Sequence, residues 1–430
     1  MNFFEDLDYI WWRFFAILIV SVLSFYWLWK SGNAKKKYYF IPFIVFIFIY
    51  SGAGFGWETC DNNYFWKYSL YFVVFGFSCY LAQRDKVTSG PSFELKNTVL
   101  SHFFKKHGSK IVWFYIALKF FTVVINGHAL NIIRPPQVDM SSMIEGSYQA
   151  KSALATLAWY LDNIVYVFYL VSLYNYRKKF GSFCFYLMLP VYLEYADVCY
   201  LGRGTIMLTL INLAIGFILC YPQYKKTVIT AALISAPFIV FALVWFSGFR
   251  MGVTLDDVDT GRALQILSYQ ETSYPLHYNS IKLWGFDPDV CYAYLYWLVT
   301  LPFPGFFRSE NVDVYFNYIF SERINGTVRG GQGFSVSLPG LVNEGIFVFG
   351  PTFFIIHALI LGFFVGKAYK WVRYSPELFL FVHCCVDVPY LISRGGTASQ
   401  YSFYLKNFLI YLIVRYIILS STSRKTNVHQ

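Results

Sequence analysis

Charged side chains are scarce in this chain of 430 residues, since Asp, Glu, Lys and Arg together make up only 14% of it. A soluble domain carries about 25% charged residues, so an ordinary water-soluble protein is excluded. Hydrophobic residues reach 57% and aromatic residues 22%. Continuous apolar runs of about 17–22 residues, the length that crosses a bilayer core, recur from end to end. The sequence therefore predicts an all-α polytopic membrane protein.

Metal and cofactor signatures are also lacking. The eight cysteines are scattered and show no metal-ligand spacing, so we read them as small apolar filler and expect neither a metal nor a cofactor.

No internal repeat is visible, which argues against the repeat-built transporters. The net charge of +11 does not indicate nucleic acid, because the basic residues lie in short loops between apolar runs.

We place about eleven transmembrane helices, with one large loop between the eighth and the ninth. The expected spans are 11–29, 38–54, 65–82, 111–127, 153–173, 180–197, 204–222, 227–247, 350–369, 376–393 and 401–419. Lysine clusters fall on one side of this arrangement, which the positive-inside rule makes cytoplasmic. We therefore expect an N-terminus outside the cytoplasm, a cytoplasmic C-terminus, and three regions: a bundle over 1–248, a large outer loop over 249–349 and C-terminal helices over 350–430.

The basic residues of the predicted outer side are mostly arginines, whereas the inner loops are rich in lysine. Arginine offers a planar fork that grips phosphate through two hydrogen bonds. Arg203, Arg250 and Arg394 lie at three outer span edges, and Arg262 and Arg329 lie in the large loop. Arg203, Arg250 and Arg394 are either topology residues that reach the membrane surface or parts of an anion clamp, and their shared level favours the clamp.

The end of the large loop holds the second group of candidates. Gly330 and Gly331 follow Arg329 directly and are either a hinge or a turn whose backbone N–H groups approach an anion. Glu344 is the one carboxylate after these glycines, and is either a general base or a buried structural acceptor. His277, the one histidine of the large loop, is either a base or an ordinary polar residue.

Lys119 and Asp162 are charged residues that fall well inside predicted spans. Charge within an apolar span is costly unless it faces the interior of the bundle or a partner. We expect Lys119 to face the bundle interior, and Asp162 to do the same.

Taken together, these features resemble the O-antigen polymerase (Wzy-type oligosaccharide repeat-unit polymerase) family of bacterial inner membranes. The resemblance covers the whole topology, with many spans and a large periplasmic loop before the last helices. Its most specific part is 330–350, where a Gly-rich lead precedes Ser-Leu-Pro-Gly, an acidic residue and a helix that enters a span. Segments 201–205 and 393–396 look like the family's outer-edge arginine positions, whereas Gln332 among the glycines departs from the pattern.

The resemblance implies a GT-C-like membrane glycosyltransferase. Such enzymes transfer a growing glycan from undecaprenyl pyrophosphate to the non-reducing end of a new lipid-linked repeat unit. Glu344, Arg203 and Arg394 would then be catalytic, and Arg250, Arg262, Arg329, Gly330 and Gly331 would bind substrate. The implied partners are the undecaprenyl-pyrophosphate-linked oligosaccharide, membrane lipids, a chain-length regulator and a flippase.

Three other classes stay open. A flippase or transporter for lipid-linked oligosaccharide would also bind the anionic lipid, but it usually shows repeats or interrupted spans. An O-antigen ligase shares the architecture and would use a loop histidine, for which only His277 is available. A polysaccharide O-acetyltransferase would need an acyl-transfer histidine, and none is convincing here.

Overall fold

The computed structural model describes residues 10–31, 55, 60–83, 98–134, 153–197, 217, 221–231, 234–235, 238, 274–300, 316–328, 337–374, 397 and 413–420. The described residues form helices and no strand, as the apolar runs predicted. Among them, two helical stretches are long and apolar enough to cross a membrane: His102–Ile125 and Gly340–Phe364. The chain divides into two compact units, which we describe separately.

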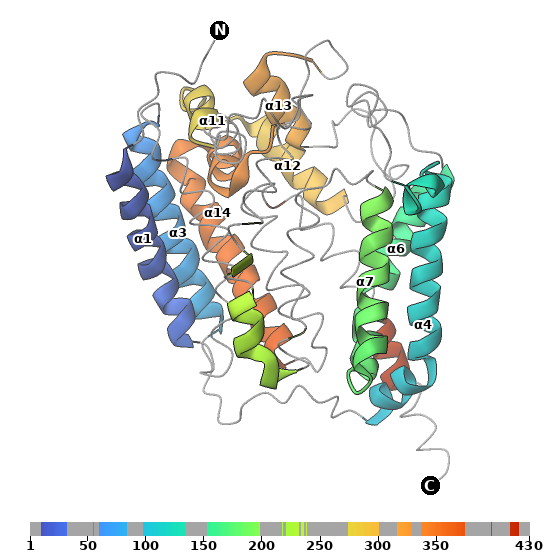
Figure 1. Ribbon diagram of the computed structural model, residues 1–430. Helices are drawn as coiled ribbons and strands as arrows, with labels where there is room; N and C mark the ends of the chain where they lie inside the picture. The colour runs from blue at the N-terminus through green and yellow to red at the C-terminus, as the bar shows by residue number, and fades with distance from the viewer. Residues whose placement is uncertain are drawn as a thin grey trace. The chain divides into compact units, whose positions relative to one another are not determined.

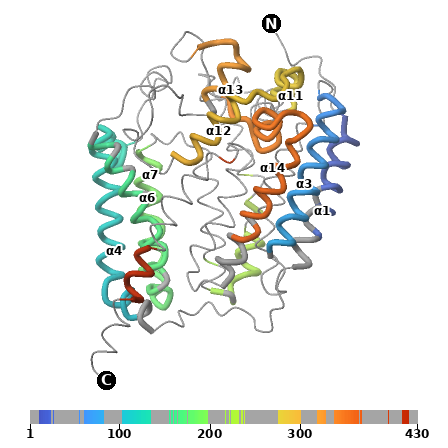
Figure 2. The backbone as a smooth tube through the Cα atoms, turned by 180° about the vertical axis from the view of Figure 1, so that it is seen from behind, coloured from blue at the N-terminus to red at the C-terminus, as the bar shows by residue number. Residues whose placement is uncertain are grey.

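The first unit contains six helices among its described residues (Figures 1 and 2). They are α1 (Trp11–Ser31), α3 (Asn62–Gln83), α11 (Tyr274–Ile281), α12 (Pro288–Thr300), α13 (Phe316–Asn325) and α14 (Gly340–Tyr374). Helix α3 packs along both α1 and α14, so helices from the two ends of the sequence lie side by side. Helices α11, α12 and α13 come from the predicted outer loop and pack on α14 or on one another.

Close contact between α3 and α14 depends on two glycines one helical turn apart. A Cβ atom at Gly362 would lie 2.5 Å from the carbonyl oxygen of Phe75, and one at Gly366 would lie 2.6 Å from that of Cys79. Small residues at this spacing let two helix backbones approach closely. The Ser78 hydroxyl also donates a hydrogen bond of 2.7 Å to the Leu359 carbonyl.

Helix α14 is broken near its first third. Gly350 has φ 79° and ψ 167°, a conformation outside the helical region that glycine adopts readily, and Pro351 follows it. A Cβ at Gly350 would lie 3.3 Å from the Cβ of Phe286, so a side chain there would be tightly packed as well as strained by the positive φ. On the other side of the break, Lys67 of α3 donates a hydrogen bond of 2.8 Å to the Pro351 carbonyl.

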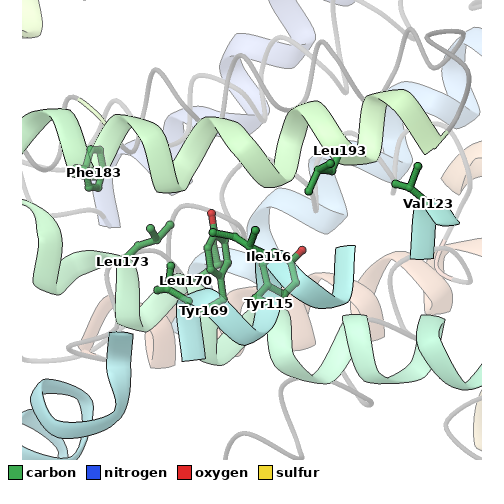
Figure 3. Close-up of a cluster of buried hydrophobic side chains, with 9 residues drawn as sticks. Tyr115, Ile116, Val123, Tyr169, Leu170, Leu173, Phe183 and Leu193 are labelled. Carbon is green, nitrogen blue, oxygen red and sulfur yellow. The ribbon is translucent and has the colours of Figure 1, made fainter. Parts of the chain in front are cut away.

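The second unit is built on α4 (Thr98–Ile125), α6 (Ala153–Leu173) and α7 (Phe180–Asp197), with α4 packed against both others. Short 3-10 turns occur at Ala129–Ile132 (η4), Tyr174–Tyr176 (η5) and Pro222–Tyr224 (η6). Apolar side chains from all three helices form its core (Figure 3), in which the rings of Tyr115 and Tyr169 stack with centroids 4.2 Å apart.

The predicted spans agree closely with some helices and less well with others. The spans 153–173 and 180–197 have the bounds of α6 and α7, and 11–29 and 65–82 fall within α1 and α3. Helix α4 begins 13 residues before the predicted 111, and α14 begins 10 residues before the predicted 350. The spans 38–54, 204–222, 227–247, 376–393 and 401–419 lie wholly or largely outside the described residues.

Candidate functional site

Glu344 lies in the first segment of α14, where residues 341–348 are all buried, and its own side chain is 0% exposed. A buried carboxylate is stable only where hydrogen-bond donors surround it. The Tyr294 hydroxyl, from α12, donates to Oε1 over 2.6 Å, and the backbone N–H of Thr397 donates to Oε2 over 2.8 Å. The carboxylate therefore joins α14 to α12 and to the segment that contains Thr397.

His357, in the second segment of α14, completes this cluster. Its Nε2 lies 3.4 Å from Oε1 of Glu344, 3.3 Å from the Tyr294 hydroxyl and 3.2 Å from Oγ1 of Thr397. Its Nδ1 lies 2.8 Å from the hydroxyl of Tyr71, which comes from α3. We call these five residues the Glu344–His357 cluster: Tyr71, Tyr294, Glu344, His357 and Thr397.

The break in α14 makes the cluster possible. Glu344 and His357 are 13 residues apart. In an unbroken α-helix that spacing would place them about 20 Å apart along the axis, with side chains about 220° apart around it. In the structure, the conformation of Gly350 turns the chain so that the two side chains meet.

Gly345 gives the cluster its close packing. A Cβ atom there would lie 3.1 Å from Nδ1 of His357 and 3.4 Å from the Tyr71 ring. Distances of this kind leave almost no space for a methyl group, because buried side chains are already close-packed. The imidazole of His357 therefore lies directly against the backbone of the first α14 segment.

Of the candidate site residues predicted from the sequence, Glu344 lies within the described part of the chain. The others lie outside it: Arg203, Arg250, Arg262, Arg329, Gly330, Gly331 and Arg394. Four cluster residues were not predicted, namely Tyr71, Tyr294, His357 and Thr397. A signal existed only for His357, because an ionisable residue within an apolar run is a candidate for function.

His277 lies in α11, and its ring packs edge-on against Phe320, with ring centroids 5.9 Å apart. Burial lowers the pKa of His277 to about 4, which outweighs the opposite effect of its hydrogen bond with the backbone of Leu338. A histidine with so low a pKa is a weak base at neutral pH. The structure thus favours the interpretation of His277 as a packed loop residue.

Arg323 of α13, another arginine of the predicted loop, pairs with Asp287. The guanidinium donates to Oδ2 over 2.8 Å, while Oδ1 accepts the backbone N–H of Asp289 over 3.0 Å at the start of α12. The hydrogen bond from Arg323 is the main reason that the pKa of Asp287 is lowered. This pair fastens α13 to the N-terminus of α12.

The second unit contains a charged group around a buried lysine, here named the Lys119 cluster, that consists of Lys119 on α4, Asp162 on α6 and Glu194 on α7. The Lys119 ammonium lies 2.9 Å from Asp162 Oδ2 and 3.4 Å from Glu194 Oε2, and Lys119 is only 8% exposed. The prediction that Lys119 and Asp162 face the bundle interior is confirmed.

No protein-family model, no curated protein and no solved structure matches this chain. Within the described ranges, no group of three or more His, Cys, Asp or Glu side chains is arranged to hold a metal ion.

Proposed function

We propose that the protein is an inner-membrane glycosyltransferase of about eleven spans and GT-C-like fold. It would polymerise undecaprenyl-pyrophosphate-linked repeat units into O-antigen or a related surface polysaccharide on the periplasmic face. The proposal combines the family resemblance of the sequence with the Glu344–His357 cluster. It is also supported by two helices of membrane-spanning length and composition, one of which contains both Glu344 and His357.

The observation that carries the proposal is the hydrogen bond from the Thr397 backbone N–H to Glu344 Oε2. It joins the acidic residue after the Gly-rich turn to Thr397, the residue that directly follows the Arg394-Gly395-Gly396 stretch in the sequence. Arg394 precedes Thr397 by three residues, and three residues of extended chain cover at most about 11 Å. We therefore expect Arg394 to act in the neighbourhood of Glu344.

The reaction needs positive charge near the leaving group, and arginine side chains can supply that charge without a metal ion. The acceptor hydroxyl oxygen attacks C1 of the first sugar of the growing chain, and the C1–O bond to the lipid pyrophosphate breaks with its electron pair. Negative charge then develops on the leaving phosphate oxygen, where positioned arginines stabilise it. The hydroxyl proton passes to a base or to the released pyrophosphate.

Of the two roles predicted for Glu344, general base and buried hydrogen-bond acceptor, the buried acceptor fits better. A general base must come within hydrogen-bond reach of the acceptor hydroxyl. The Glu344 side chain has no exposed surface, and both of its oxygens accept hydrogen bonds from the protein. We propose that it holds the segment after Arg394 in place, while the arginines contact the pyrophosphate.

The environment of His277 disfavours an O-antigen ligase. A ligase with this architecture would rely on a loop histidine, yet burial lowers the pKa of His277 to about 4 and its ring packs on Phe320. We therefore expect His277→Ala to retain the polymer ladder.

The test replaces Arg394 by Ala in source cells whose own copy of the gene is deleted. Because one preorganised electrostatic partner typically contributes about 10²–10³ in rate, long glycan chains should disappear while single repeat units still reach the finished glycolipid. Arg394→Lys should restore them only in part, since the bidentate fork is lost. The matched control is Arg134→Ala, an exposed arginine after α4, which should leave the ladder unchanged.

Three outcomes would redirect the proposal. A full ladder with Arg394→Ala at normal expression would refute the clamp. Accumulation of all glycan on undecaprenyl pyrophosphate after deletion of the gene would indicate a ligase. Single units trapped on the cytoplasmic side would indicate a flippase.

A further inference from the structure

His357 Nε2 faces three oxygen atoms, a concentration of acceptors that simple packing does not require. They are Glu344 Oε1 at 3.4 Å, the Tyr294 hydroxyl at 3.3 Å and Thr397 Oγ1 at 3.2 Å. All three belong to elements other than the second α14 segment, on which His357 itself lies. The imidazole therefore contacts α12, the first segment of α14 and Thr397 at once.

The hydrogen bonds are consistent with a proton on Nε2 of His357. Tyr294 donates its hydroxyl proton to Glu344 across the short 2.6 Å bond, so that proton is not available to His357. We assign a proton to Nε2, which then donates into the group of oxygens. Nδ1 is left to accept from the Tyr71 hydroxyl at 2.8 Å, which fixes the plane of the ring.

We propose that His357 is a positioning residue of the polymerase. Its imidazole holds Glu344 and the Thr397 side chain together and so fixes the position of Thr397, three residues after Arg394 in the sequence. This inference rests on the proposed function. His357 touches no substrate in this scheme; it acts through Glu344 and Thr397.

The alternative is that His357 only fills space between aromatic neighbours. Its ring packs beside Phe349, with centroids 5.7 Å apart, and beside Tyr71 at 5.9 Å. A phenyl ring would make similar packing contacts, but it would leave buried polar groups without a partner, which is costly. Comparing Phe with Gln at position 357 therefore separates packing from hydrogen bonding.

The experiment measures polymer formed per unit time in membranes from cells that carry each variant, together with the melting temperature of each purified protein. His357→Phe should lower the rate about 10²-fold, the usual effect of a misplaced reacting group. His357→Gln keeps an N–H donor and should recover most of that loss. A space-filling role predicts the reverse order, with Phe tolerated and Gln harmful.

Thr397→Val provides a milder test if the His357 variants fold poorly. It removes the hydroxyl that contacts Nε2 and keeps both the shape and the backbone N–H that Glu344 accepts. We expect a loss of about tenfold at an unchanged melting temperature. A wild-type rate for Thr397→Val would overturn the inference, whatever the His357 variants do.

Arg394→Ala distinguishes failure of the positioning role from failure of the proposed function. If Arg394→Ala loses the ladder while His357→Phe and Thr397→Val keep it, the positioning role is wrong and the proposed function stands. If Arg394→Ala keeps the ladder, the pyrophosphate clamp itself is wrong. Loss of the ladder in both Arg394→Ala and His357→Phe, with recovery in His357→Gln and a reduced rate for Thr397→Val, supports both.

Discussion

The Lys119 cluster allows a quantitative prediction for the second unit. Lys119→Met removes the ammonium but keeps an unbranched side chain of similar length. Asp162, only 19% exposed at its side chain, then loses the cation that lies 2.9 Å away. Breaking a buried ion pair by removing one partner typically costs about 3–5 kcal/mol, because an uncompensated charge stays buried. We expect a loss of this size in the free energy of unfolding.

The two carboxylates should contribute unequally. Glu194 is 46% exposed at its side chain and lies 3.4 Å from the ammonium, near the end of α7 at Asp197, so it depends less on the cation than Asp162 does. Exposed ion pairs contribute about 0–1 kcal/mol, and Glu194→Gln should cost no more than that. The double variant Lys119→Met/Asp162→Leu removes both buried charges and should regain most of the stability, since well-packed apolar replacements of a buried pair are often neutral.

Unfolding of the purified protein in mixed micelles, titrated with a denaturing detergent, measures these differences. Lys110→Met is the matched control, because Lys110 is an exposed lysine of the same helix and its loss should change stability by no more than about 0.5 kcal/mol. The reasoning is refuted if Lys119→Met is as stable as the control, or if the double variant is no more stable than Lys119→Met.

Three further predictions concern the loop, the helix contact and the topology. Because the folded state holds the pKa of His277 at about 4 against an ordinary 6.5, the unfolded chain binds an extra proton between these values. Stability should therefore fall by at most about 3 kcal/mol as the pH drops from 6.5 to 4, and His277→Asn should flatten that slope in a pH series of melts. Gly362→Ala places a Cβ 2.5 Å from a backbone oxygen of α3 and should cost about 1–3 kcal/mol, whereas Gly181→Ala, with open space around it, should not destabilise the protein. Reporter fusions should place Lys105 in the cytoplasm and Arg262 in the periplasm, and the reverse result would overturn the topology.

Local sequence was sufficient for the helices whose apolar runs end in clear polar breaks. The bounds of α6 and α7 agree with prediction because Arg177, Lys178 and Lys179 interrupt the apolar pattern between them. Helix α4 was predicted too short because its first turns carry Lys105, Lys106 and Lys110, which hydropathy assigns to a loop although lysine is a good helix former. The inward orientation of Lys119 also followed from sequence, since a charge in an apolar span needs a partner.

The sequence by itself thus determined the all-helical class, several helix bounds and Glu344 as the acidic candidate. Tertiary structure alone decided what Glu344 touches. Helical periodicity places Glu344 and His357 on different faces, and only the turn at Gly350 brings them within 3.4 Å. Tyr71 and Tyr294 lie 286 and 63 residues from His357, and no local pattern encodes contacts across such separations. They depend on α3, α12 and α14 packing together, because the hydrogen bonds of a buried carboxylate come from whichever donors the fold brings to it.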